Sequence, residues 1–228
     1  MYGQKTYVWF DAGLKVQVGK TALFNQAIAD SDLVDYSLSN GFSYGGKFGI
    51  NLGEGNSGFT FDLMFSDFKG EFENQDFMGQ AEFNMKAMEL YVLFRNEQNL
   101  SYFEIGPKFS FLRDASRRFI GEGLPGTSED VTDQFKNGIT GVLGFGFNLI
   151  GTDGAFTGKI GLRFEYGITD IVNDSGQALF APLGIQEIYN EGYKGSHPIF
   201  AGVVFEINWG LGYFAKTKCG GRTKFFSL

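Results

Sequence analysis

Charged side chains recur at even spacings along this chain, and their types could support ion pairing. Arg163 and Glu165 stand two residues apart, and Asp11 and Lys15 stand four apart. Successive side chains of an extended chain point to opposite faces, so residues at even separations share a face. The set contains six acidic and six basic residues: Asp11, Asp62, Glu89, Glu104, Glu165, Glu206, Lys15, Lys47, Arg95, Lys108, Lys159 and Arg163. Equal numbers of carboxylates and cations predict a network without net charge.

Catalytic and metal-binding candidates are few. The chain has one histidine, His197, and one cysteine, Cys219, which excludes a multi-histidine metal centre, a disulfide framework and a cysteine-rich metal site. Ser196 is adjacent to His197, but adjacent side chains on an extended chain point apart. The sequence therefore predicts no catalytic residue, no metal site and no cofactor, and we expect that the chain is not an enzyme.

Composition narrows the class of protein. Of the 228 residues, 34 are glycine and 27 are phenylalanine, while the net charge is −7. The acidic balance argues against a nucleic-acid partner. No run approaches the 18 or more apolar residues of a transmembrane helix. Met1 leads directly into the alternating pattern described next, so we expect that any signal peptide has been removed or truncated.

Apolar residues alternate with polar or small ones, which is the periodicity of β-strands. Between residues 7 and 18, for example, Val8 and Phe10 fall on one face while Asp11 and Lys15 fall on the other. The pattern predicts eight strands over residues 7–18, 41–52, 59–66, 85–95, 101–111, 139–149, 156–168 and 199–213. One face of these segments is continuously apolar and aromatic, and the opposite face carries the twelve charged residues.

The connections between these segments alternate in length. Short turns are expected near 53–58, 95–99 and 151–155, and long loops near 19–40, 67–84, 113–137 and 170–198. This alternation is typical of a transmembrane barrel with periplasmic turns and longer extracellular loops. We therefore predict an all-β fold, an eight-stranded antiparallel up-and-down transmembrane β-barrel over residues 1–215, followed by a short basic C-terminal tail over 216–228. A soluble β-sandwich is the alternative, but the strand lengths exceed the usual five or six residues.

The polar face would line a narrow interior. An eight-stranded barrel is just wide enough for side chains to fill it, and an unpaired buried charge is costly. Balanced charge thus predicts a plugged, ion-paired lumen. The planar guanidinium of Arg163 can hold two carboxylates, and Glu206, on the neighbouring final strand, is its expected partner.

The whole pattern resembles the OmpA/OmpX-type small outer-membrane barrels. The stretch YFEIGPKFSF at residues 102–111 is similar to a central strand common in PorT-like barrels of Bacteroidota-type bacteria. Pro107 lies within it and predicts a β-bulge, because proline has no N–H for the strand ladder. The resemblance implies a location in the cell outer membrane, contact with outer-membrane lipid and lipopolysaccharide, and protein partners for the extracellular loops, with no nucleic acid.

Three functions remain open at this point. The first is a structural or interaction barrel, acting through its long loops or within a larger outer-membrane assembly. The second is a narrow channel for small solutes, and the third is a lipid A-modifying enzyme using His197. Separately, Arg113, Arg117 and Arg118 follow the fifth strand, where guanidinium groups could contact lipopolysaccharide phosphates.

Overall fold

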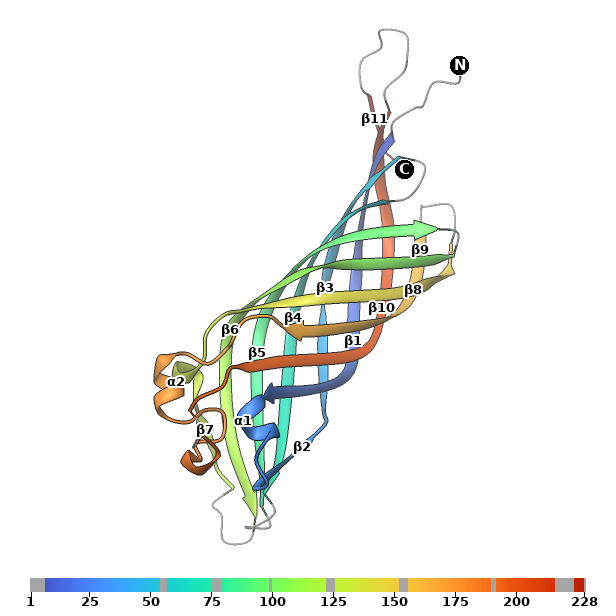
Figure 1. Ribbon diagram of the computed structural model, residues 1–228. Coiled ribbons are helices and arrows are strands. Elements are labelled where there is room, and N and C mark those ends of the chain that lie inside the picture. The colour runs from blue at the N-terminus through green and yellow to red at the C-terminus, as the bar shows by residue number, and fades with distance from the viewer. Residues whose placement is uncertain are drawn as a thin grey trace.

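The computed structural model describes residues 7–53, 57–74, 79–98, 100–121, 126–151, 156–189, 192–215 and 224–227. Eight long antiparallel strands form a closed ring (Figure 1). They are β1 (Tyr7–Asn25), β3 (Ser39–Leu52), β4 (Ser57–Asn74), β5 (Gly79–Gln98), β6 (Ser101–Gly121), β8 (Gly138–Ile150), β9 (Phe156–Gly167) and β10 (Ser196–Ala215). Each pairs with the next in this order, and β10 pairs with β1 from Asn25↔Ser196 to Tyr7↔Ala215. The predicted eight-stranded up-and-down barrel is confirmed.

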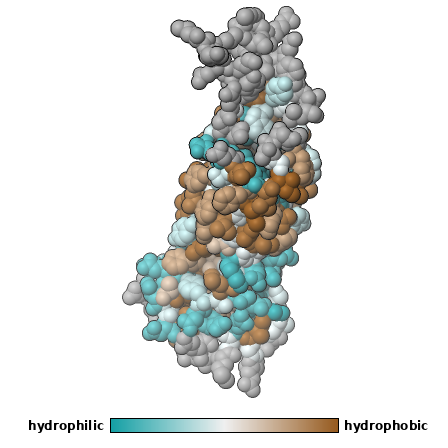
Figure 2. All heavy atoms as spheres, turned by 90° about the vertical axis from the view of Figure 1, so that its right-hand side faces the viewer, coloured by the Kyte–Doolittle hydropathy of each residue, from teal (hydrophilic) through white to brown (hydrophobic). Residues whose placement is uncertain are grey.

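The two faces of the strands differ as the alternation predicts. Leu14 is 60% exposed, whereas Lys15, the next residue of β1, is 1% exposed. Outward-facing leucine, phenylalanine, valine and isoleucine side chains form a band around the middle of the barrel (Figure 2). A closed ring with this apolar band satisfies both requirements of a lipid environment, which are complete backbone pairing and an apolar outer surface. None of the helices in the described part of the chain is long and apolar enough to cross a membrane.

Several strands continue well beyond their predicted ends on the long-loop side. The segment 67–84, predicted as a loop, belongs to a hairpin in which β4 runs to Asn74 and β5 starts at Gly79. Side chains still alternate between the two faces there, but the apolar residues now point inward and the charged residues point outward. Phe72 and Phe83 face inward at 1% and 2% exposure, while Lys69 and Glu73 face outward. The prediction ended these strands early because it assigned apolar residues to the outer face only.

The segments between the long strands fold into a small unit that we call the loop cap. It contains α1 (Gln26–Ala29), β2 (Val34–Ser37), β7 (Ser128–Asp130), η1 (Thr132–Gln134), α2 (Asp174–Ala178) and η2 (Gln186–Tyr189). Its residues share one buried apolar cluster with the inner faces of β1 and of the β4–β6 extension. Ile28, Val34, Val131, Phe135, Ile171, Val172, Leu183, Ile188 and Tyr189 pack with Leu23 of β1 and with Phe72, Phe83 and Ala115. The rings of Phe83 and Phe135, for instance, lie 4.7 Å apart. The cap therefore closes the barrel at this end (Figure 1).

The prediction of a β-bulge at Pro107 needs correction. The register between β6 and β8 is continuous across Pro107, which lies opposite Gly141, and the β5–β6 ladder only skips two pairs there before resuming in the same register. The predicted bulge at Pro107 is wrong, because a gap in one ladder accommodates the missing N–H. The bulge lies at Arg113, between the pairs Lys86↔Asp114 and Ala87↔Leu112.

The C-terminal segment contributes one more strand at the short-turn end. β11 (Lys224–Ser227) pairs with residues 212–215 of β10, beyond the point where β9 ends opposite Trp209. It covers a strand edge that would otherwise be open to other chains. The remainder of the predicted basic tail, 216–223 and 228, lies outside the described residues.

The closed ring makes a testable prediction about electrophoresis. Folded barrel in detergent, loaded without boiling, should migrate as a band distinct from that of the boiled, unfolded chain. The reason is that complete strand pairing with no free edge resists dodecyl sulfate until heat disrupts it. Identical migration before and after boiling, for protein that shows β-rich circular dichroism, would contradict a closed barrel.

Candidate functional site

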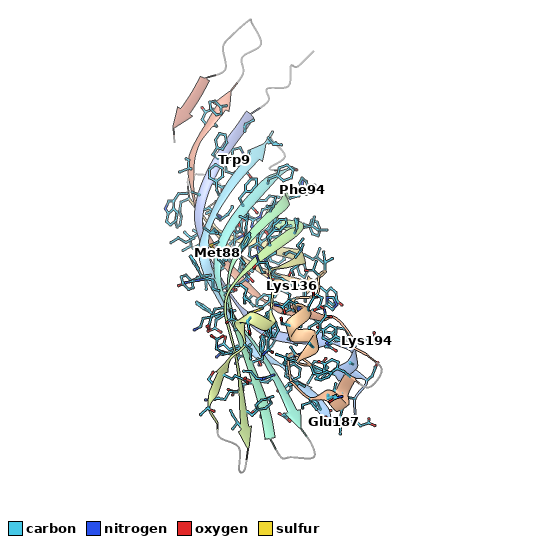
Figure 3. All side chains as sticks on the ribbon, turned by 90° about the vertical axis from the view of Figure 1, so that its left-hand side faces the viewer. Trp9, Met88, Phe94, Lys136, Glu187 and Lys194 are labelled. Atoms are coloured by element: carbon cyan, nitrogen blue, oxygen red, sulfur yellow. The ribbon has the colours of Figure 1, made fainter. Side chains whose placement is uncertain are left out.

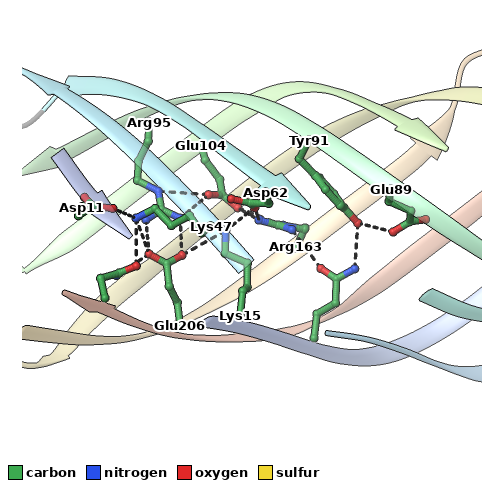
Figure 4. Close-up of polar contacts among 12 residues, drawn as sticks. Asp11, Lys15, Lys47, Asp62, Glu89, Tyr91, Arg95, Glu104, Arg163 and Glu206 are labelled. Carbon is green, nitrogen blue, oxygen red and sulfur yellow. Dashed lines mark hydrogen bonds and ion pairs between the residues drawn. The ribbon is translucent and has the colours of Figure 1, made fainter. Parts of the chain in front are cut away.

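The interior of the barrel brings together all twelve charged residues singled out by the sequence. They come from seven of the eight long strands, β1, β3, β4, β5, β6, β9 and β10, and each occupies an inward position opposite the apolar band. The eighth long strand, β8, contributes none of the twelve. The most exposed of the twelve is Lys108, at 7%. Figure 4 shows the contacts that link several of them, together with Tyr91, along the lumen. The predicted ion-paired interior thus has a definite geometry, which can be followed from the short-turn end to the cap.

Glu206 on β10 is the hub at the short-turn end. Arg95 donates to both of its carboxylate oxygens at 2.7 Å, and Lys47 donates to Oε1 at 2.9 Å. The ammonium of Lys15 lies 3.2 Å from Oε2. Lys47 also lies 2.9 Å from Asp11. One carboxylate therefore joins three cations that originate on three different strands.

Glu104 and Arg163 dominate the middle of the lumen. Arg163 donates to Glu104 Oε1 from Nη2 at 2.5 Å and from Nε at 3.0 Å, and its Nη2 lies 3.4 Å from Asp62. The other oxygen of Glu104 accepts from Arg95 at 2.7 Å. Lys15 lies 2.5 Å from Asp62 and so links this level to Glu206. The two arginines are thereby joined through a shared carboxylate.

The expected pairing of Arg163 with Glu206 is wrong. In the β9–β10 ladder, Arg163 lies opposite Gly202, and Glu206 lies opposite Lys159. The two charged residues are therefore separated by four positions along the strand. Arg163 does hold two carboxylates, as its planar fork allows, but they are those of Glu104 and Asp62, which reach it from across the barrel.

The third level lies next to the loop cap and is built around Lys108. Its ammonium donates to Glu165 at 2.6 Å and to Glu89 at 2.9 Å. The Tyr91 hydroxyl lies 2.9 Å from Glu89 and 3.0 Å from Glu165, and it accepts from Gln17 at 3.0 Å. The guanidinium of Arg163 stacks over the Tyr91 ring at 4.8 Å. Tyr91 therefore joins the third level to the middle level of Glu104 and Arg163.

Sequence analysis missed Glu97, Gln17 and Tyr91 as members of the network. Glu97 contacts Lys159 and lies 3.7 Å from Arg95, so it adds a seventh carboxylate to the six expected. The signal was available, since Glu97 continues the alternation of Glu89 and Arg95. It was overlooked because the strand was expected to end at residue 95.

Glycines provide the room that these long side chains need. A Cβ atom at Gly144 would lie 2.7 Å from Cγ and 2.8 Å from Oε1 of Glu104. A Cβ atom at Gly49 would lie 2.5 Å from Oδ1 of Asp11. Such contacts are too close for any side chain, so the positions of the two carboxylates depend on glycine at 144 and 49.

Ser196 and His197 do not form a catalytic pair. Ser196 is fully buried, and its hydroxyl accepts from Asn25 at 2.9 Å. His197 is on the opposite face of β10, where its ring stacks on Tyr166 and Nδ1 lies 3.0 Å from the carbonyl of Gly167. The geometry gives no support to a lipid A-modifying enzyme that uses this histidine. Among the described residues, no group of three potential ligand side chains is placed to hold a metal ion.

The three arginines after the fifth predicted strand are divided between different environments. Arg117 turns toward the cap, where it donates to Glu129 at 2.8 Å and to the carbonyl of Pro182 at 3.2 Å. Arg118 pairs with Glu82 at 2.8 Å on the outer surface. Arg113 faces outward with its guanidinium 5.7 Å from the Phe65 ring of the apolar band. Of the three, Arg113 is the one placed at the edge of this band.

Within the cap, a tyrosine stabilises the first loop. The Tyr36 hydroxyl donates to the Asn25 carbonyl at 2.6 Å and accepts from the Asn25 amide at 2.8 Å. Burial raises the pKa of Tyr36 to about 12. The hydroxyl therefore stays protonated at any physiological pH and can serve both bonds.

The chain is similar in structure, at low sequence identity, to several solved proteins. Neither a protein-family model nor a curated protein sequence matches the chain. Among solved structures, Ail of Yersinia pestis, in complex with the heparin analogue sucrose octasulfate, is 13% identical, with a TM-score of 0.41, covering 87% of this chain and 99% of that one. The outer-membrane protein OprG of Pseudomonas aeruginosa is 10% identical, with a TM-score of 0.36 and coverage of 91% and 96%. The outer-membrane protease OmpT of Escherichia coli is 8% identical, with a TM-score of 0.37 and coverage of 92% and 99%.

One prediction is corrected by these comparisons. The expectation that the chain is not an enzyme rested on the absence of a catalytic motif. OmpT, one of the solved structures named above, is an outer-membrane protease. The exclusion of catalysis therefore does not stand.

The revised pairing predicts the outcome of a double-mutant cycle in the lumen. Arg163→Ala should lower the free energy of unfolding by roughly 3–5 kcal/mol, because it removes one of the two buried cations that each of Glu104 and Asp62 contacts. Arg163→Ala combined with Glu104→Gln should cost less than the sum of the single changes. Denaturant titration in detergent micelles, followed by tryptophan fluorescence, measures each value.

The matched control is the cycle of Arg163→Ala with Glu206→Gln. These two residues do not contact each other, so their coupling should be smaller than that of Arg163 with Glu104. The structure would be contradicted by stronger coupling to Glu206 than to Glu104.

Proposed function

We propose that this chain is an outer-membrane barrel that does not conduct and that acts through its folded loop cap, either by binding a partner outside the cell or within a larger outer-membrane assembly. The observation that carries this proposal is the combination of a lumen filled by ion pairs with a cap that packs on the barrel through a buried apolar cluster. A barrel without a passage has its remaining accessible chemistry on the cap and on the outer wall.

The band of apolar side chains supports the membrane location. Phe61, Leu63 and Phe65 are 36–46% exposed on consecutive outward positions of β4, and neighbouring strands repeat the pattern. In water, such a belt would be a large exposed apolar surface, which soluble monomers rarely tolerate. In the outer membrane, it would face the hydrocarbon chains.

The charge of the outer surface supports placing the cap outside the cell. Basic residues Lys20, Lys69, Lys86 and Arg113 face outward just beyond the apolar band. Further out, the cap exposes mainly acidic residues: Asp30, Asp32, Asp35, Glu129, Asp130, Asp133, Asp174 and Glu187. Figure 3 shows Glu187 at this end of the molecule, far from Trp9. A basic rim suits the phosphate groups of lipopolysaccharide, and Arg113 is the member of the predicted arginine group that would contact them.

A narrow channel for small solutes is less well supported by the geometry. The space between the Lys108 level and the cap is a cavity of about 20 Å³, lined by Met85, Glu89, Leu112 and Ile171 among others. That volume suits about one water molecule. Below it, the network of Glu104, Arg163 and Glu206 crosses the lumen.

Conductance in planar bilayers tests the closed lumen. Purified barrel whose folding has been verified by heat-modifiability should give no steady current, only small or flickering events, because the ion pairs occupy the passage. A large, steady conductance from monomeric protein would contradict the closed lumen and would favour a channel for small solutes.

Surface labelling tests the orientation. In a Cys219→Ser background, cysteine at Asp32 or Glu187 should react with an impermeant maleimide on intact cells, because both positions are exposed on the cap. Leu100→Cys, which is 56% exposed at the opposite end, is the matched control and should react only after lysis. Labelling of Leu100→Cys on intact cells, with none at the cap, would show that the cap faces the periplasm.

A further inference from the structure

The outer wall of the barrel opens locally where β3 separates from β4. The β3–β4 ladder ends at Phe42↔Asp67, and β4 regains a partner on that side only at Glu71, opposite Ser37 of β2. Within the described part of the chain, residues 68–70 have no strand partner on that side. The side chain of Thr21 on β1 bridges the gap by donating to the carbonyl of Lys69 at 2.6 Å. The result is an external groove of about 550 Å³.

The groove combines positive charge with an apolar edge. Lys20 and Lys69 both line it and are exposed, with Asn40 opposite Lys20 in the β1–β3 ladder. Val18 and Phe42, at 41% and 45% exposure, form its side toward the apolar band. A ligand in this groove would meet two ammonium groups at one end and the hydrocarbon region at the other.

The groove also contains a hydrogen-bond acceptor that lacks a donor. Asp67 lines the groove, and its Oδ1 is buried without a hydrogen-bond partner among the described residues. A ligand that carries hydroxyl or N–H donors beside an anionic group could donate to Asp67 while its anion lies near Lys69, two residues further along β4.

We propose that this groove binds the phosphorylated sugar headgroup of an outer-leaflet glycolipid. The phosphate would lie between Lys20 and Lys69, a sugar hydroxyl group would donate to Asp67, and an acyl chain would follow Phe42 into the apolar band. The inference rests on the proposed outer-membrane location for the source of the lipid. It is independent of Arg117, which is engaged by Glu129 and the cap.

Binding of lipid A to the purified barrel tests this site. Native mass spectrometry from detergent micelles would compare phosphorylated lipid A with the same lipid after enzymatic removal of its phosphates. Wild-type protein should bind the phosphorylated form at least roughly tenfold more tightly, and Lys20→Gln combined with Lys69→Gln should abolish that preference. Lys136→Gln combined with Lys194→Gln is the matched control, because it removes two exposed lysines from the cap region and should leave binding unchanged.

Two further measurements test which parts of the glycolipid are recognised. Inorganic phosphate should compete only weakly, because it has neither sugar hydroxyls nor an acyl chain; full competition by phosphate alone would overturn the glycolipid assignment. Asp67→Ala should weaken binding while keeping the preference for the phosphorylated lipid. Equal affinity for both lipids, or an unchanged preference in the Lys20 and Lys69 variant, would overturn the proposal.

Failure of this site can be distinguished from failure of the proposed function. Each variant must show heat-modifiable migration, so loss of binding cannot be attributed to misfolding. If the barrel binds phosphorylated lipid A through Lys20 and Lys69 but the labelling experiment places the cap inside, the site stands and the orientation is wrong. If the cap lies outside and the lipid preference is absent, only the site is wrong.

Discussion

Pairing of the first and last long strands is the constraint on which the rest of the structure depends. β1 and β10 remain in register from Asn25↔Ser196 to Tyr7↔Ala215, with one shift between Phe10 and Asp11. Without this seam, both strands would present unpaired N–H and C=O groups, which the lipid interior cannot satisfy. The seam also creates an inside and an outside, so that the same alternation places Leu14 toward lipid and Lys15 in the lumen.

Closure in turn explains the chemistry of the lumen. Burying so many charges is unfavourable unless each is paired and hydrogen-bonded. The network meets this requirement by sharing: Glu206 joins three cations, and Glu104 joins Arg95 to Arg163. Removing one partner therefore affects several others, and this arrangement favours one packing of the interior over alternatives. The network also requires glycine at positions 144 and 49, since a larger residue there would displace the carboxylates of Glu104 and Asp11.

The sequence was sufficient to predict the strands, their faces and the inward set of charged residues, because these depend only on parity along the chain. Three features required the folded structure. The partner of Arg163 depends on strand register and on which side chains meet across the barrel, and neither can be read from one strand. The extension of β4 and β5 was hidden because Phe72 and Phe83 reverse the usual relation between hydrophobicity and face. The cap was hidden for a similar reason: its apolar cluster is assembled from short segments such as α1 and η2, none of which has a periodic pattern of its own.

The most direct test of the account is amide hydrogen exchange of the folded protein in micelles, measured by NMR for β1 and β10 together with β4 and β5. A closed barrel predicts that the β1–β10 seam is protected to the same degree as the β4–β5 hairpin, whose strands are adjacent in the chain. Fast exchange along the paired stretch of β1 and β10, with protection retained in β4 and β5, would show an open sheet and would contradict both the sealed lumen and the membrane-spanning ring.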